Sequence, residues 1–159
     1  MGIRVEIDDR NLQVELAERI AKLQDMRPLM TLIGQAMVER NRLRFDRQVS
    51  PDGERWAPTK RGGQILRKSG ILFSSLLVGE VTNSSVEIGT NVPYAAALHF
   101  GTKPYVIKPR LKKALFWPGA DHPVSQVNHP GLTPRPFLGI NDDDQQEMFS
   151  IIGRFLEGA

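Results

Sequence analysis

Two stretches rich in proline and glycine divide this chain and limit the length of any helix or strand within it. Residues 50–64 hold two prolines, three glycines and five charged residues, and residues 118–134 hold four prolines. Regular structure does not continue through such sequences, because proline lacks an amide hydrogen and glycine leaves the backbone free. The first stretch predicts a long mobile loop. The second predicts a loop or extended arm of the kind found at interfaces.

Periodicity in the first part of the chain predicts one strand and two helices. Residues 3–7 alternate apolar and charged side chains, as a half-buried strand does. Apolar residues at helical spacing predict a helix over residues 12–23, and Pro28 suits the first turn of a second helix. The second helix carries an apolar stripe formed by Leu29, Leu32, Ile33, Ala36, Met37 and Leu43. We expect the two helices to form a hairpin packed on a sheet.

Several short elements are predicted between the two stretches. A short helix is expected around residues 69–77, and alternating runs at residues 76–82 and 85–90 predict a β-hairpin turning at Asn83-Ser84. Residues 94–100 predict about one helical turn, and residues 105–107 and 114–117 predict two further strands. The buried face of the hairpin is expected to consist of Val78, Val81, Val86 and Ile88.

The end of the chain carries the pattern of a capped helix. Asn141 suits the N-cap position, three aspartates follow it in the first turn, and Gly158 suits the C-terminal end. Its expected core face consists of Met148, Ile152, Phe155 and Leu156. At 159 residues the chain fits a single domain over residues 1–159. The element order predicts an α+β fold, with the helical hairpin and the C-terminal helix packed on a mainly antiparallel sheet.

Residue content excludes several classes of site. The chain has no cysteine, so disulfides, thiolate metal sites and thiol nucleophiles are excluded. No apolar run approaches the roughly 20 residues that a membrane span needs, and the polar N-terminus is unlike a signal peptide. We therefore expect synthesis in the cytoplasm and no membrane partner.

A catalytic constellation is not evident either. His99, His122 and His129 do not have the spacing of a metal site, and consecutive aspartates on a helix point about 100° apart, so they cannot converge on one metal. Glycine-rich phosphate loops and nucleophile elbows are missing as well. We predict a protein without cofactor or metal that is not an enzyme. A hydrolase acting through His122 or His129 is a weaker alternative.

The charge distribution is uneven. The chain carries a net charge of +3, and a basic patch is formed in the sequence by Arg40, Arg42, Arg44 and Arg47. These arginines fit the solvated face of a helix, and they also fit a surface for phosphates. The second interpretation leads to an alternative function as a basic nucleic-acid-binding protein.

Four motifs follow one another along the chain. They are Ser50-Pro51-Asp52-Gly53 with Trp56 and Pro58; Ile65-Leu66 with Ser69-Gly70 and Leu72; Ile88-Gly89-Thr90-Asn91 with Tyr94-Ala95 and His99-Phe100-Gly101; and Pro134-Arg135-Pro136-Phe137-Leu138-Gly139. In this order they resemble the motifs of the phage virion morphogenesis, or tail completion, family, which includes the tail completion protein of phage P2 and the gene G product of phage Mu. The likeness covers residues 28–156, with residues 103–133 inserted before the last motif.

The resemblance implies a structural part of the virion at the neck or tail terminus, needed for tail completion and head-tail joining. It implies a homo-oligomeric, hexameric ring, with head-tail connector or stopper proteins on one side and tail tube or terminator proteins on the other. A passing contact with DNA in the lumen of the ring is a further expectation. Interface candidates are Arg55, Trp56, Arg61, Tyr94, His99, Phe100, Arg135 and Phe137. We expect Arg135 to pair with an acidic neighbour, and we leave open whether Trp56 anchors its own loop or an interface.

Overall fold

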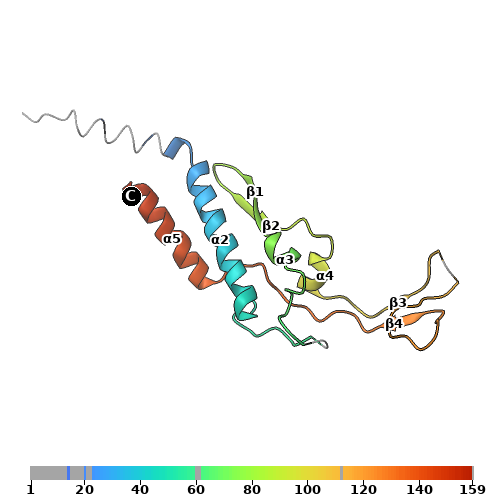
Figure 1. Cartoon of the computed structure of the whole chain (residues 1–159). Coiled ribbons are helices and arrows are strands. Elements are labelled where there is room, and N and C mark those ends of the chain that lie inside the picture. The colour runs from blue at the N-terminus through green and yellow to red at the C-terminus, as the bar shows by residue number, and fades with distance from the viewer. Residues whose placement is uncertain (1–13, 15–19, 21–22, 60–61, 112, 159) are drawn as a thin grey trace, which may run out of the picture. The chain divides into compact units, whose positions relative to one another are not determined.

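The computed structural model describes residues 14, 20, 23–59, 62–111 and 113–158. The strand expected at residues 3–7 lies outside this part of the chain, and so does most of the helix expected at residues 12–23. In chain order (Figure 1) the elements are α2 (Arg27–Arg47), α3 (Ile71–Ser74), β1 (Leu77–Val81), β2 (Val86–Gly89), α4 (Ala95–Phe100), β3 (Tyr105–Ile107), β4 (Val127–His129) and α5 (Asp142–Glu157).

The chain forms two compact units, each assembled from segments that are distant in the sequence. The first unit combines Leu76–Gly89 with the described parts of Met1–Arg42 and Ile140–Ala159. The second unit combines the described parts of Leu43–Ser75 and Thr90–Gly139. Because the chain passes from one unit to the other several times, neither unit is a continuous sequence domain.

Helices α2 and α5 and the β1–β2 hairpin form the core of the first unit. Its buried centre consists of Leu29, Ile33, Met37 and Ile151, and residues of the hairpin pack against it. Gly34 allows α2 to approach the hairpin closely, because a Cβ there would lie 2.6 Å from Val86 Cγ2. The predicted stripe is wrong at two positions: Leu32 and Leu43 are about half exposed. They lie beside the apolar face of α2, where the hairpin and α5 do not cover them.

The predicted hairpin is confirmed. Strands β1 and β2 pair antiparallel, with Leu77 opposite Gly89 and Val78 opposite Ile88, and the register shifts before Val81 pairs with Val86. Val86 and Ile88 are half-buried and pack on the core of the first unit. The exposed residues of this hairpin include Leu77 as well as Glu80 and Glu87, so its solvated face is not wholly polar.

The predicted C-terminal helix is confirmed, with its cap. Its predicted core face is wrong at one position, because Leu156 is 40% exposed and Ile151 is the buried residue. The Asn141 side chain accepts a hydrogen bond from the Asp144 amide at 2.9 Å, and the Asp144 carboxylate accepts one from the Asn141 amide at 2.9 Å. This reciprocal arrangement is a capping box, which satisfies two amides at the helix start. Gly158 ends the helix in the left-handed region, at φ 86°.

An aromatic cluster around Phe45 forms the core of the second unit. The Phe45 ring lies 5.5 Å from the ring of Trp56, 5.5 Å from Phe137 and 5.8 Å from Phe73. Phe45 and Phe137 are almost fully buried. The short predicted helices that flank this core are confirmed as α3 and α4.

The strand pairing late in the chain differs from the prediction. The strand at residues 105–107 is present as β3, but its partner is β4 in residues 127–129. Leu115 makes only an isolated bridge to Val124. A turn at Trp117–Ala120 reverses the chain, so the partners of residues 105–115 come from the stretch that we expected to be irregular. The α+β class is confirmed, with two separate two-stranded sheets.

Candidate functional site

A long β-hairpin, called the arm below, spans Thr102 to Leu132. At its base Thr102 and Leu132 exchange backbone hydrogen bonds of 3.0 and 3.2 Å. Strands β3 and β4 follow, with Tyr105 opposite His129, and Leu115 and Val124 exchange two more backbone hydrogen bonds of 2.8 and 3.0 Å further along. The two sides of the arm therefore pair at its base, along β3 and β4, and again at Leu115 and Val124, and the sequence predicted this arm only in part.

Two glycines allow the close backbone approach at the base of the arm. Gly131 has φ 88°, and a Cβ there would lie 2.2 Å from the Thr102 carbonyl oxygen. Gly101 has φ 74°, and a Cβ there would lie 2.6 Å from the Leu132 carbonyl oxygen. Only glycine fits this combination of left-handed backbone and tight contact. The base is further held by the His129 Nδ1 atom, which accepts a hydrogen bond from the Gly131 amide at 3.0 Å.

A tight turn closes the far end of the arm. The Ala120 amide donates to the Trp117 carbonyl at 3.0 Å, and Gly119 adopts φ 91°. Proline followed by a glycine of positive φ is the signature of a type II turn. The turn at Trp117–Ala120 therefore reverses the direction of the chain between the two sides of the arm.

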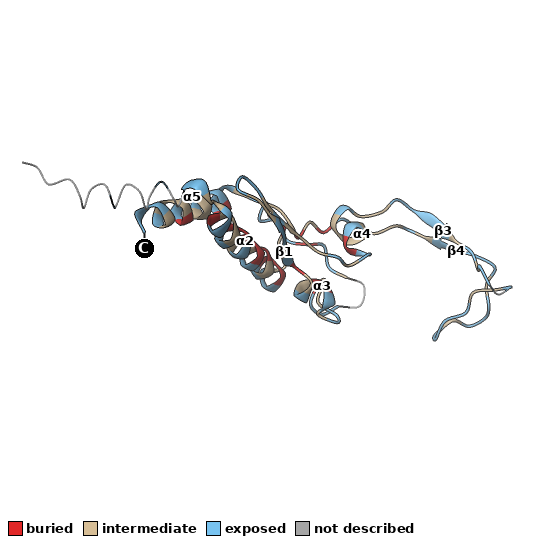
Figure 2. Ribbon diagram, turned by 90° about the horizontal axis from the view of Figure 1, so that it is seen from above, coloured by how far each residue is buried: buried red, intermediate tan, exposed pale blue. Residues whose placement is uncertain are grey.

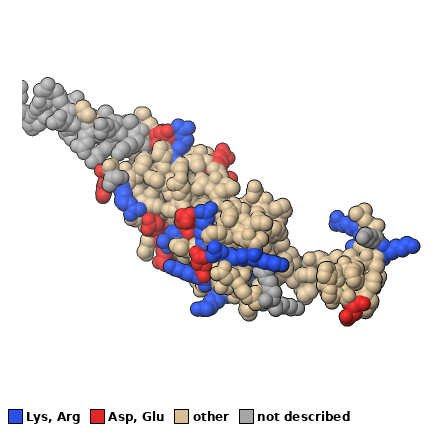
Figure 3. All heavy atoms as spheres, viewed as in Figure 1, with Lys and Arg blue, Asp and Glu red and all other residues tan. Residues whose placement is uncertain are grey.

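The arm exposes large apolar side chains. Leu111 is fully exposed, Phe116 is 66% exposed, and Trp117 is 46% exposed. Figure 2 shows exposed and intermediate residues along β3 and β4. Basic side chains project from the same segment (Figure 3). Exposed apolar residues gathered on one segment are typical of a contact surface.

Trp56 belongs to the core of the second unit. Its side chain is only 5% exposed, and its indole Nε1 donates a 2.8 Å hydrogen bond to the Pro136 carbonyl. Of the two roles left open for Trp56, intramolecular anchoring is the one observed. The Phe45 ring lies against it, so the side chain is covered within the chain itself. The mobility of the loop at residues 50–64 stays a prediction.

Arg135 is buried and holds backbone carbonyls. Its Nε donates to the Ala57 carbonyl at 3.0 Å, and its terminal nitrogens donate to the Pro58 and Thr133 carbonyls at 3.3 Å. The predicted acidic neighbour is therefore wrong. A guanidinium carries five donors in a fixed plane, so it can fasten several backbone segments at once. Here it connects Ala57 and Pro58, in the loop of residues 50–64, with Thr133, which follows the arm in the sequence.

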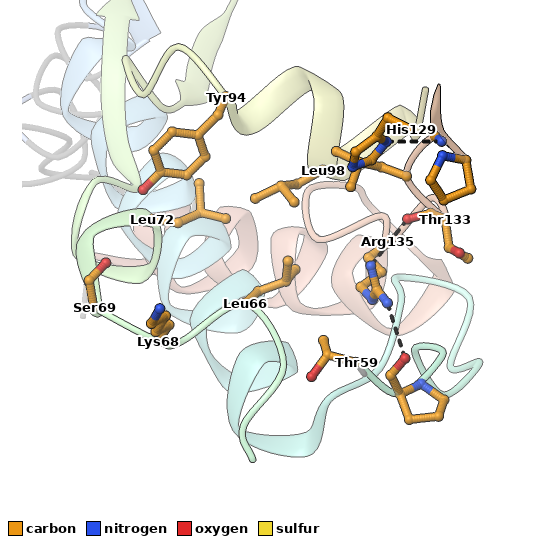
Figure 4. Close-up of a pocket in the computed structure, with 14 residues that line it drawn as sticks. Thr59, Leu66, Lys68, Ser69, Leu72, Tyr94, Leu98, His129, Thr133 and Arg135 are labelled. Carbon is orange, nitrogen blue, oxygen red and sulfur yellow. Dashed lines mark hydrogen bonds between the residues drawn. The ribbon is translucent and has the colours of Figure 1, made fainter. Parts of the chain in front are cut away.

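A pocket of about 730 Å³ lies at the base of the arm within the second unit. Leu66, Leu72 and Leu98 contribute apolar surface, and Tyr94, His129 and Arg135 contribute polar groups. Figure 4 shows these side chains around the pocket, with Arg135 hydrogen-bonded to the Thr133 and Pro58 carbonyls. The third and fourth sequence motifs thus meet here, together with part of the second.

His99 is half-buried between aromatic rings. Its ring lies 4.5 Å from that of Phe100 and 5.1 Å from that of Phe137, and its Nδ1 accepts a hydrogen bond from the Phe137 amide at 3.3 Å. Burial lowers the pKa of His99 below its ordinary value of 6.5. Protonation of Nδ1 would also remove the acceptor for the Phe137 amide.

We expect the free energy of unfolding to depend on pH through His99. Because the folded-state pKa is lowered, the stabilisation is fully present above pH 6.5 and is lost as pH falls through the folded pKa. Urea unfolding at about pH 7.5 and about pH 5 measures this loss, and His99→Gln should reduce it. His122→Gln, an exposed histidine of the arm, is the matched control and should retain the wild-type dependence. An unchanged dependence in His99→Gln would contradict the assignment.

The four arginines of the predicted basic patch are not equivalent. Arg40 pairs with Asp144, Arg42 donates to Glu39 and to the Leu76 carbonyl, and buried Arg44 donates to the Gly139 carbonyl at 2.7 Å. Arg47 is exposed. Three of the four therefore have partners within the chain. The expectation of a joint basic patch is not supported.

The remaining interface candidates fall into three groups. Tyr94, Phe100 and Arg55 are exposed, and Phe100 is 77% exposed. Phe137 is buried in the aromatic core. Arg61 lies outside the described residues. Sequence reasoning missed Leu111, Phe116 and Trp117 as surface residues, although their position among lysines and prolines was a usable signal.

Two absences can be stated for the described part of the chain. It contains no group of three His, Asp or Glu side chains placed to hold a metal ion. Nor does it contain a helix with the length and apolar character of a membrane span.

A comparison with models of protein families shows to which family the chain belongs. The model of the phage virion morphogenesis family matches residues 7–157. The chain belongs to this family. The match extends beyond residues 28–156, where the motifs lie, and it includes the arm. No curated protein and no solved structure matches the chain, so the likeness to the two individual phage proteins stays a prediction. A member of this family has a role in assembling the phage particle.

Proposed function

We propose that this protein is a subunit of a ring at the neck or tail terminus of a phage particle, where it completes the tail and joins it to the filled head. Membership of the phage virion morphogenesis family supports an assembly role. The observation that carries the proposal is the arm, because its exposed apolar residues suit contact with another molecule.

The proposed partners are of two kinds. Further copies of the chain form the ring, for which we propose six subunits, since contacts between unlike surfaces close into a ring when the rotation allows it. Connector or stopper proteins on the head side and tail tube or terminator proteins on the tail side complete the junction. The internal pairing of Arg40, Arg42 and Arg44 gives no support to a separate nucleic-acid-binding function.

A phage that lacks this chain tests the proposal. We expect filled heads and separate tails, because no subunit completes the junction, and we expect joining to be restored when the protein is supplied from a plasmid. Electron microscopy of lysates and a count of infectious particles measure both outcomes. Normal infectious particles made without the chain would overturn the proposal.

A further inference from the structure

We propose that the arm of one copy binds the outward face of α5 in the neighbouring copy. The inference rests on the assembly role proposed above and names the two surfaces that meet. Its partner is a second copy of this chain, recognised by complementary charge and by exposed apolar residues.

The two surfaces carry opposite charge. The arm segment at residues 103–133 has five basic residues and one acidic residue, a net charge of +4. Helix α5 has five acidic residues and one basic residue, a net charge of −4. Asp144 is buried and pairs with Arg40, and Glu147 pairs with Arg154. The exposed Asp142, Asp143 and Glu157 remain to attract a basic surface. Complementary charge steers two surfaces together and fixes their register.

The outward face of α5 also offers apolar contacts. At 100° per residue, Asp142, Gln146 and Phe149 lie on one side of the helix, and Gly153, Leu156 and Glu157 continue it. Phe149 is 71% exposed and Leu156 is 40% exposed. No atom lies within 4 Å of a Cβ placed on Gly153, so this position is a notch between the two apolar side chains. The notch and its neighbours suit a large side chain such as Phe116 or Trp117.

The dimensions of the two surfaces limit the contact. Helix α5 has 16 residues and is therefore about 24 Å long. The part of the arm between Ile107 and Leu115 is not extended, because their partners Val127 and Val124 are only three residues apart. We therefore expect the arm to contact part of the outward face of α5, around Phe149 and Leu156.

Two variants with exchanged charge test the contact by sedimentation. The arm variant carries Lys108→Glu, Arg110→Glu and Lys113→Glu, and the α5 variant carries Asp143→Lys, Gln146→Lys and Glu157→Lys. All six positions are exposed, so we expect only a small fall in melting temperature, most of it in the α5 variant, which loses Asp143 from the first turn of the helix. We expect each variant alone to associate about tenfold more weakly than the wild type, or weaker still. Glu80→Lys with Glu87→Lys, two exposed acidic residues outside α5, is the control and should associate normally.

Mixing the two variants separates contact between copies from contact within one chain. In the mixture, the acidic arm of the arm variant can bind the basic α5 of the α5 variant, and the basic arm of the α5 variant can bind the acidic α5 of the arm variant. The mixture should therefore form assemblies in which the two variants alternate. If the arm bound α5 of its own chain, a chain that carries both sets of changes would recover normal association, whereas the mixture of the two variants would not. That result would overturn the proposal, and so would normal association of either variant alone.

A variant without charge change gives an independent result. Gly153→Gln fills the notch and replaces glycine by a better helix former, so the helix should be at least as stable as before. We expect weaker association with an unchanged or higher melting temperature, and unchanged association would contradict the role of the notch. These measurements use purified protein alone. The contact between the arm and α5 can therefore be disproved while phages that lack the chain still show separate heads and tails. Equally, the contact can be confirmed while such phages are normal, which would overturn only the proposed function.

Discussion

Replacing Trp56 by alanine should lower the free energy of unfolding by about 3–5 kcal/mol. The side chain is buried against Phe45, and its indole nitrogen bonds the Pro136 carbonyl. Truncation removes these contacts and leaves a cavity in the core of the second unit. Chemical unfolding followed by circular dichroism measures the change. We expect the loss to be large because this aromatic core is small and Trp56 is one of its principal members.

The chain provides a matched control in its other tryptophan. Trp117 lies on the arm and is 46% exposed, so Trp117→Ala should change the free energy of unfolding by about 0.5 kcal/mol or less. Its effect is expected on association instead. A small loss of stability in Trp56→Ala, equal to that in Trp117→Ala, would show that Trp56 does not anchor the core.

Local sequence signals predicted most of the elements. The periodicity of residues 28–47 and the cap at Asn141 predicted α2 and α5, because these signals depend on residues close to one another in the chain. The hairpin of β1 and β2 followed from alternation around a polar turn. In α2 the pattern predicted the helix but only part of its buried face, because Leu32 and Leu43 are exposed while Asn41 and Arg44 are buried.

The errors concern contacts between distant residues. Phe45 lies next to the predicted stripe of α2, and nothing near it in the sequence indicates that Trp56 and Phe137 surround it. The partner of β3 was missed because β4 lies in a stretch with four prolines, where strand signals are weak. Arg135 looked like an exposed charge between prolines, and its carbonyl partners appear only when the chain returns from the arm.

The candidate surface was only partly predictable for the same reason. An arm was expected from residues 118–134, but its other side, which carries Leu111 and Phe116, was assigned to the linker between two strands and to a strand. A side chain is exposed when no distant part of the chain packs over it. The residues next to it in the sequence do not show whether this happens. By contrast, the charge difference between the arm and α5 is visible in the sequence once the two segments are defined.

Replacing Asp144 by alanine should destabilise the first unit by about 2–3 kcal/mol, because Asp144 is buried and charge-paired whereas its partner Arg40 is a third exposed. Asp144 is 1% exposed, pairs with Arg40 on α2, and accepts the Asn141 amide in the capping box. Alanine would leave the Arg40 guanidinium without this carboxylate and one amide without its acceptor. Urea unfolding monitored by circular dichroism measures the loss.

The neighbouring aspartate separates this role from the general preference of helix N-termini for negative charge. Asp143 lies in the same turn but is exposed, so Asp143→Ala should cost only about 0.3–1 kcal/mol. Asp144→Asn keeps the size of the side chain and loses its charge, so its cost should fall between those of the two alanine variants. Equal costs for Asp143→Ala and Asp144→Ala would mean that the dipole alone accounts for both residues. A much larger cost at Asp144 would be due to the two contacts that distinguish it from Asp143, the ion pair with Arg40 on α2 and the bond from the Asn141 amide.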